Sequence, residues 1–303
     1  MTPTDSTPEG GPLGSSHAEL IAEIAHSFSS RPVDIRPVDI RRERSGRRAR
    51  GPARSVLVAV AHGSRDPAAR ETVSLLLEQV RALRPGLDVR LAHLGLNQPL
   101  LDDVLADLRS AEAVLVPLLL GRGHHVRVDI PAAVARHPRL DAAVATPLGP
   151  HPLLAEALRL RLAEVGWDDP EVTRERRRDA RDAVVLAASG SKDPASAKDA
   201  QTQALLLAAR LHVPVVPAYV SAAAPTVPQA VAALRERGYR RIAVSSYFTA
   251  PGDFASLAAG AAPWLVAPPL GAQQAMARLL LDRYDVARDT AAAHRLGAIR
   301  AAV

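Results

Sequence analysis

The 303-residue chain is 48% hydrophobic, which is enough apolar material for one large or two ordinary domains with their own cores. Its formal net charge is +6, but the segment from Arg41 to Arg54 alone holds seven arginines against Glu43. The rest of the chain is therefore close to neutral, and only 3% of the residues are aromatic, so the composition argues against a nucleic-acid-binding protein. Cysteine is absent, which excludes disulfides, thiolate metal sites and a catalytic thiol.

The first 54 residues have the composition of a tail. They begin with a stretch rich in Pro, Gly, Ser and Thr and end in the arginine block. Such a segment buries too little apolar surface to offset the entropy of ordering it, so we expect residues 1–54 to form a disordered, arginine-rich tail. This start has neither the basic nor the apolar region of a secretory signal, and no apolar run reaches the roughly 18 residues of a membrane span. We therefore expect a cytoplasmic protein with no membrane partner.

From Ser55 the chain alternates strand-like and helix-like runs. The strand-like runs are short and apolar, as in strands that are buried on both faces of a parallel sheet. Strand followed by helix in this rhythm predicts βαβ units and a parallel sheet. The expected strands cover residues 56–60, 88–94, 113–120 and 142–147, and the expected helices cover 68–83, 99–108, a stretch after Pro131, and 152–165.

The same pattern then begins again. A charged segment, residues 169–182, precedes a new strand-like run, and the sequence GSRDPA that starts at Gly63 returns as GSKDPA at Gly190. Two later pairs of motifs follow in the same order, which indicates duplication of an α/β unit. We expect two tandem α/β domains, at 55–168 and 183–285, joined by a linker at 169–182 and followed by a C-terminal extension at 286–303. Each should be a parallel sheet flanked by helices, and a pseudo-twofold axis should relate them.

Two histidines distinguish the first unit from its copy. His62 follows the first strand and His125 follows the third, whereas the corresponding positions of the second unit hold Ser189 and Phe254. Ligands bind outside the carboxyl ends of parallel strands, so both imidazoles are expected at one edge of the sheet. Neutral imidazoles suit a borderline divalent ion, and two protein ligands leave coordination positions open. His93 and His124 are additional candidate ligands.

Three motifs carry a family resemblance. AHGSRDP at residues 61–67, GHHVRVDIP at 123–131 and PLGPHP at 147–152 resemble the sirohydrochlorin chelatases of the CbiX type, and the second unit resembles a degenerate copy. The resemblance implies a lyase-type chelatase that inserts Fe²⁺ or Co²⁺, as a substrate, into sirohydrochlorin for sirohaem or cobalamin synthesis. It implies no organic cofactor, and a fused two-unit chain would be a monomer with an internal pseudo-dimer. By position, His62 and His125 would bind the metal and accept protons.

The same resemblance implies which groups hold the tetrapyrrole. Its carboxylates would be bound near the two histidine loops by Ser64, Arg65, Arg122 and Arg127. Guanidinium groups suit that purpose because they hold carboxylates with two hydrogen bonds.

The chain departs from the family pattern at one position, and two other functions are therefore considered. Members of the family often place a glutamate after the second strand, where this chain has Gly95. One alternative is therefore a relative that binds metal or tetrapyrrole without inserting metal. Another is a small-ligand binding module, since two similar α/β lobes flank a cleft. Metal uptake into sirohydrochlorin separates the first alternative from a chelatase, and histidine-dependent metal binding argues against the second.

Overall fold

The computed structural model describes residues 55–108, 112–167, 181–260 and 263–301. The expected tail at 1–54 and nearly all of the expected linker lie outside these residues. In the first unit the elements are β1 (Val56–Ala61), α2 (Pro67–Leu83), β2 (Val89–His93), α3 (Leu101–Leu108), β3 (Glu112–Pro117), a π-helical turn η1 (His125–Asp129), α4 (Ile130–Ala135), β4 (Asp141–Val144) and α5 (Pro152–Glu164). In the second they are β5 (Asp182–Ala188), α7 (Pro194–Leu211), β6 (Val215–Tyr219), α8 (Val227–Glu236), β7 (Arg241–Ser246), α9 (Asp253–Ala259), β8 (Leu265–Ala267) and α10 (Gln274–Ala301).

The two units have the same sheet. The strand order is β2-β1-β3-β4 in the first and β6-β5-β7-β8 in the second, and every pairing is parallel. The central strands β1 and β5 are buried along their whole length, as expected for apolar runs covered on both faces. The predicted α/β class, with two similar parallel sheets flanked by helices, is thereby confirmed.

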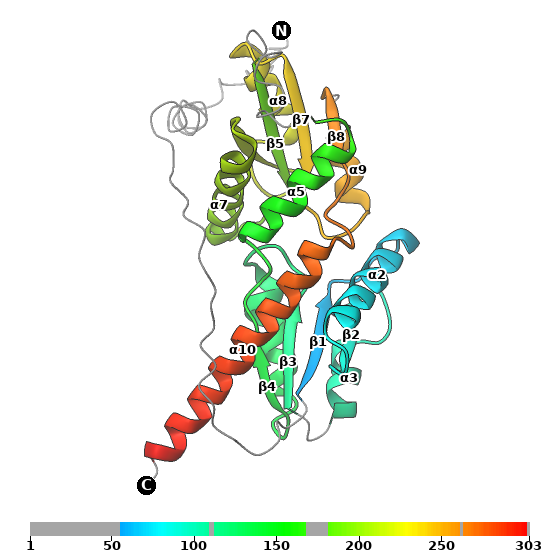
Figure 1. Ribbon diagram of the computed structural model, residues 1–303, viewed down its shortest axis with the longest axis vertical. Coiled ribbons are helices and arrows are strands. Elements are labelled where there is room, and N and C mark those ends of the chain that lie inside the picture. The colour runs from blue at the N-terminus through cyan, green and yellow to red at the C-terminus, as the bar shows by residue number, and fades with distance from the viewer. Residues whose placement is uncertain (1–54, 109–111, 168–180, 261–262, 302–303) are drawn as a thin grey trace, which may run out of the picture.

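The sheets are stacked end to end, with the carboxyl ends of their strands facing each other (Figure 1). The loops that follow β1, β3, β5 and β7 therefore meet between the two lobes. Two hydrogen bonds join these loops across the gap. The Tyr247 hydroxyl donates to the Leu120 carbonyl at 3.0 Å, and the Thr249 hydroxyl donates to the Leu118 carbonyl at 3.1 Å.

The last helix of each unit packs in the other unit's lobe. Helix α5 ends the first unit in sequence but packs on α7, β7 and β8, whereas α10 packs on α2, β3 and β4 (Figure 1). A bidentate pair between Arg84 and Asp285, with both N–O distances at 2.7 Å, holds α10 beside α2. Helix α10 also runs without a break through residue 285, after which we expected a separate extension.

This exchange gives the lobes a shared core. One hydrophobic cluster contains residues of both central strands and of both exchanged helices, among them Leu57, Leu186, Leu158 and Leu280. Each of these four leucines is fully buried. Because each sheet needs a helix from the other unit to cover one face, the two units stabilise each other, and the cleft between them is held in place.

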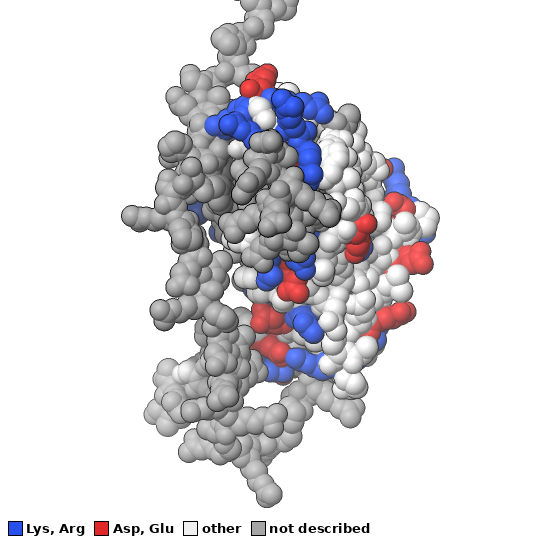
Figure 2. Space-filling model, turned by 45° about the horizontal axis from the view of Figure 1, so that its top comes forward, with Lys and Arg blue, Asp and Glu red and all other residues white. Residues whose placement is uncertain are grey.

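The outer faces of the sheets have separate cores. Residues of α3 and α4 cover the outer face of the first sheet, and residues of α8 and α9 cover that of the second. Over the part of the chain that the structure describes, no helix combines the length and the apolarity that crossing a membrane requires. Figure 2 shows Lys and Arg gathered at one end of the visible surface and both charge signs mixed over the rest.

One half-buried histidine, His151, makes the stability of the fold depend on pH. The His151 Nδ1 accepts a hydrogen bond from the Leu153 amide at 3.1 Å and so caps α5. Burial, aided by Arg283, lowers the pKa of His151. Between its folded pKa and the unfolded value of about 6.5 the unfolded chain binds more protons, so stability falls as the pH falls through this window.

We expect His151→Asn to weaken this dependence, because asparagine caps a helix without titrating. The melting temperature of the variant should decline less than that of the parent between pH of about 7.5 and 5.5. Parallel declines in the two proteins would contradict a role for His151.

Candidate metal-binding cleft

The loop after β1 presents His62 to the space between the lobes. Gly63 turns the chain with φ of 98°, and a Cβ there would overlap the carbonyl oxygen of Gly95. The Asp66 carboxylate then accepts a hydrogen bond from the Ala68 amide at 2.8 Å and starts α2. The tight turn leaves the His62 side chain exposed at the carboxyl edge of the sheet.

His125 comes from the loop after β3. We expected a strand to residue 120 and a helix only after Pro131, and both expectations are wrong. The strand ends at Pro117, and helical backbone begins at His125. Pro131 lies near the start of α4, directly after this π-helical turn. The side chain of His125 is thus fixed by a helical turn.

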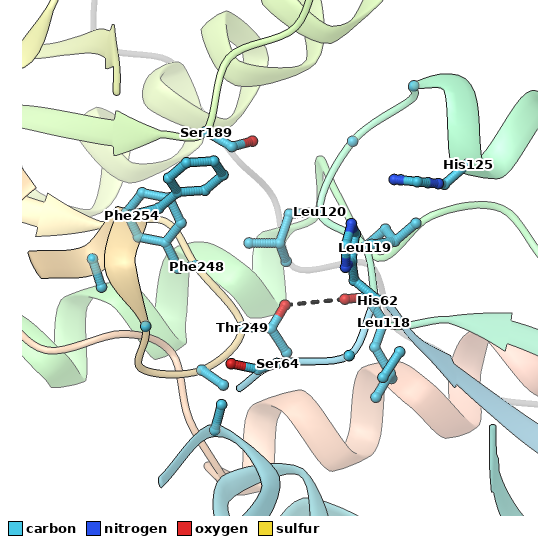
Figure 3. Close-up of a pocket in the computed structure, with 18 of the residues that line it drawn as sticks. His62, Ser64, Leu118, Leu119, Leu120, His125, Ser189, Phe248, Thr249 and Phe254 are labelled. Carbon is cyan, nitrogen blue, oxygen red and sulfur yellow. Dashed lines mark hydrogen bonds between the residues drawn. The ribbon is translucent and has the colours of Figure 1, made fainter. Parts of the chain in front are cut away.

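The two imidazoles lie next to each other. The ring centroids of His62 and His125 are 4.7 Å apart, with the ring planes at 88°. A metal ion bonded to two ring nitrogens at about 2.0–2.1 Å places those nitrogens roughly 3–4 Å apart. Small rotations of the side chains bring two rings at this separation into such a geometry. Figure 3 shows both histidines on one side of the pocket.

Asp129 contacts His125 and His124. It is not among the site residues that the sequence predicts. Its carboxylate lies 2.5 Å from His125 Nδ1 and 3.6 Å from His124 Nε2. A carboxylate on Nδ1 fixes the tautomer with the proton on that nitrogen and leaves Nε2 free to bind a metal. The sequence did contain a signal, since Asp129 follows His125 by four residues and shares its helical face.

The other candidate histidines occupy different surroundings. The His93 side chain lines the cleft but is buried, its Nδ1 is 3.3 Å from the Pro99 carbonyl, and burial lowers its pKa. The His124 side chain is 72% exposed. No group of three His, Cys, Asp or Glu side chains able to hold a metal occurs among the described residues. His62 and His125 are therefore the pair that the structure brings together.

Two of the three predicted arginines contact the second unit. The Arg122 guanidinium holds the buried Asp199 carboxylate with two hydrogen bonds, at 2.5 and 3.0 Å. Arg127 lies 3.3 Å from Asp193. Both contacts join the lobes beside the histidine loops. A role of these two arginines in binding substrate stays a prediction.

Ser64 and Arg65 line the cleft with groups that remain available. The Ser64 hydroxyl oxygen accepts a hydrogen bond from the Asp66 amide at 3.1 Å, so its own proton is free to be donated. Arg65 is exposed, and none of the described residues forms an ion pair with it.

The cleft itself has a volume of about 840 Å³. Its lining comes from the loops after β1 and β3 of the first unit and from those after β5 and β7 of the second. This volume lies within the range of pockets that bind cofactor-sized organic molecules, about 300–1,000 Å³. The geometry thus combines two adjacent imidazoles, a supporting carboxylate and room for a large ligand.

We expect Asp129→Asn to weaken metal binding by about 10-fold or more, because the loss of a partner behind a ligating histidine costs about 10–100-fold in metal affinity. Titration of the protein with Co²⁺ measures the effect. Asp102→Asn is the matched control, since Asp102 lies 3.3 Å from His137 Nε2 and does not line the cleft. Equal Co²⁺ affinities in the two variants would contradict the supporting role of Asp129.

The chain is similar in sequence to two proteins of known name. The chain is 26% identical over 203 residues to a protein named sirohydrochlorin cobaltochelatase from Priestia megaterium, a match that covers 64% of this chain and 63% of that relative. It is 27% identical over 124 residues to a protein of the same name from Methanococcoides burtonii, with 36% of this chain and 95% of that relative covered.

A solved structure shows the same fold. SirB from Bacillus subtilis with Fe³⁺ superposes with a TM-score of 0.64 at 21% identity, over 80% of this chain and 97% of that one. The CbiX family model matches residues 56–165 and again residues 183–287, so it recognises both units of the duplication. These matches span well over half of the chain, and the protein therefore belongs to the CbiX family.

Proposed function

We propose that the protein is a sirohydrochlorin chelatase that inserts Fe²⁺ or Co²⁺ into the tetrapyrrole. The observation that carries this proposal is the His62–His125 pair, with ring centroids 4.7 Å apart, at the edge of a cleft of about 840 Å³. The names of the two curated relatives support sirohydrochlorin as the substrate class and cobalt as a metal, and the SirB structure with Fe³⁺ supports iron. The metal is a substrate here, because it leaves the site within the product.

The reaction requires metal delivery and proton removal. A divalent ion that enters the macrocycle replaces two pyrrole N–H protons, so the balance is metal-free tetrapyrrole plus M²⁺ giving metallated tetrapyrrole plus two H⁺. In the proposal His62 and the His125 Nε2 hold the ion beside the macrocycle. Neutral imidazoles accept protons near pH 7, so the same side chains suit the removal of the pyrrole protons.

Asp129 gives this site a negative charge that the Gly95 position lacks. Hydrogen bonded to His125 Nδ1, it orients that ring and leaves Nε2 available for the ion. Asp129 thus offers a physical reason why a chain without the expected glutamate retains the histidine pair. Ser64 and Arg65 are the proposed groups that bind the carboxylates of the tetrapyrrole.

The test is metal insertion by the full chain. Metal-free sirohydrochlorin is incubated with Co²⁺ or Fe²⁺ under anaerobic conditions, with and without the protein, and the visible spectrum is followed. We expect the protein to accelerate the spectral change well above the uncatalysed rate. Binding of sirohydrochlorin or metal without any acceleration would instead support a binding protein that does not insert metal.

A further inference from the structure

The first unit forms one wall of the cleft and the second unit forms the opposite wall. Equivalent backbone positions in the two walls carry different side chains. The Leu148 amide donates to the Leu119 carbonyl in the first unit, and the Leu270 amide donates to the Phe248 carbonyl in the second, both at 2.9 Å. Leu119 and Phe248 are therefore equivalent positions.

The repeated motifs relate the other positions. Ser189 takes the place of His62, and Phe254 takes the place of His125. At the position of His125 the second unit therefore presents a phenyl ring, and at the position of Leu119 it presents another.

These phenyl rings form a pair on the wall opposite the histidines. Phe248 follows β7 and Phe254 lies in the first turn of α9, and both line the cleft. Their ring centroids are 6.5 Å apart with the planes at 42°. Figure 3 shows the pair on one side of the pocket and His62 and His125 on the other.

This aromatic pair is partly exposed: Phe248 is half-buried and Phe254 is exposed. The sequence contains only three phenylalanines, and two of them are on this wall. Phe254 is 45% exposed, although its ring packs beside Phe248. Apolar rings that face a cleft gain free energy when a flat apolar surface covers them, and aromatic contacts add to that gain.

We propose that Phe248 and Phe254 form the surface on which one face of the conjugated macrocycle packs. The opposite face of the macrocycle is then turned toward His62 and His125, so the metal enters from the histidine side. The inference rests on the proposed function, because it takes a tetrapyrrole as the ligand. It also explains why the second unit lost its imidazoles, since a ligating pair on both walls would compete for the same ion.

The test separates binding of the macrocycle from binding of the metal. Phe254→Ala is expected to weaken the binding of metal-free sirohydrochlorin about 10-fold, because it removes one of the two aromatic rings on which the flat macrocycle packs. Phe254→Trp should restore the binding. The Co²⁺ affinity of the variant without tetrapyrrole should equal that of the parent, because the histidines lie on the other wall. In the insertion assay the KM for sirohydrochlorin should rise more than kcat falls.

Leu257→Ala is the matched control. Leu257 lies one turn further along α9, is 61% exposed and does not line the cleft, so its removal should leave sirohydrochlorin binding unchanged. Melting temperatures check that each variant folds. Because Phe254 is 45% exposed and lies outside the buried core, Phe254→Ala decides the result even where Phe248→Ala fails to fold.

The outcomes distinguish this inference from the proposed function. A parent protein that binds sirohydrochlorin but inserts no metal overturns the chelatase proposal, whereas a loss of binding in Phe254→Ala then still supports the aromatic surface. Unchanged binding in Phe254→Ala overturns the aromatic surface and leaves the chelatase proposal intact. A parent that binds no tetrapyrrole overturns both.

Discussion

Replacement of either His62 or His125 with alanine is expected to abolish metal insertion. Among the described residues these two imidazoles are the closest pair in the cleft, with ring centroids 4.7 Å apart, so each substitution removes half of the proposed ligand pair. Loss of a supporting partner alone costs about 10–100-fold in metal affinity, and loss of a ligand should cost at least as much as the upper end of that range. Insertion rates with Co²⁺ and Fe²⁺, together with Co²⁺ titrations, measure the loss.

The same substitutions should leave stability almost unchanged. His62 is exposed and the His125 side chain is 41% exposed, so neither fills the core. Ser189→Ala is the matched control, because it alters the equivalent loop of the second unit without removing an imidazole. Insertion at the parent rate in both histidine variants would remove the basis of the chelatase proposal and favour a binder without insertion activity.

Gly63→Ala is expected to destabilise the fold strongly. At Gly63 the added methyl group would overlap the Gly95 carbonyl oxygen, on a backbone with φ of 98°. At Gly86, with φ of 85°, an added methyl group has nothing within 4 Å. Gly86→Ala therefore costs only the left-handed conformation, about 1–2 kcal/mol, whereas Gly63→Ala should cost roughly 2 kcal/mol more through the displaced backbone. Denaturant unfolding of both variants measures the difference.

Gly190→Ala is the control that separates the loss of stability in Gly63→Ala from its effect on metal insertion. Gly190 is the counterpart of Gly63, and a methyl group there would overlap the Ser221 carbonyl oxygen. We expect Gly190→Ala to destabilise the fold about as much as Gly63→Ala, but only Gly63→Ala shifts the residue next to it, His62. At a temperature where both variants are folded, insertion should therefore be slower in Gly63→Ala. Equal insertion rates would show that the Gly63 turn does not position the histidine.

The sequence predicts the duplicated unit and its parallel sheet because both depend on the local pattern of residues. Short apolar runs rich in β-branched residues, such as residues 56–60, favour strands covered on both faces, and each GS-DP turn caps its helix in the same way. Asp66 and Asp193 accept hydrogen bonds from Ala68 and Ala195 at 2.8 and 2.9 Å. His62 and His125 could be paired for a similar reason, since the carboxyl ends of neighbouring parallel strands meet at one edge.

The local sequence pattern does not determine where strand β3 ends and where the next helix begins. The sequence from Leu118 to Pro131 predicts a longer strand and a later helix than the structure has, because leucines are compatible with either conformation. The helical turn that begins at His125 brings Asp129 under the ring four residues away. In an extended segment Asp129 would lie too far from His125 to contact its ring, so the local pattern does not predict this contact.

Everything that crosses between the units was decided by the tertiary structure. The exchange of α5 and α10, the contact of Arg122 with Asp199 and the position of Phe254 opposite His125 all depend on how the two lobes face each other. Sequence periodicity specifies which face of a helix is apolar, but any apolar surface of suitable shape satisfies that face. The sequence by itself thus determined the duplicated α/β unit and its histidine pair, whereas the packing of one unit on the other decided the shared core and the second wall of the cleft.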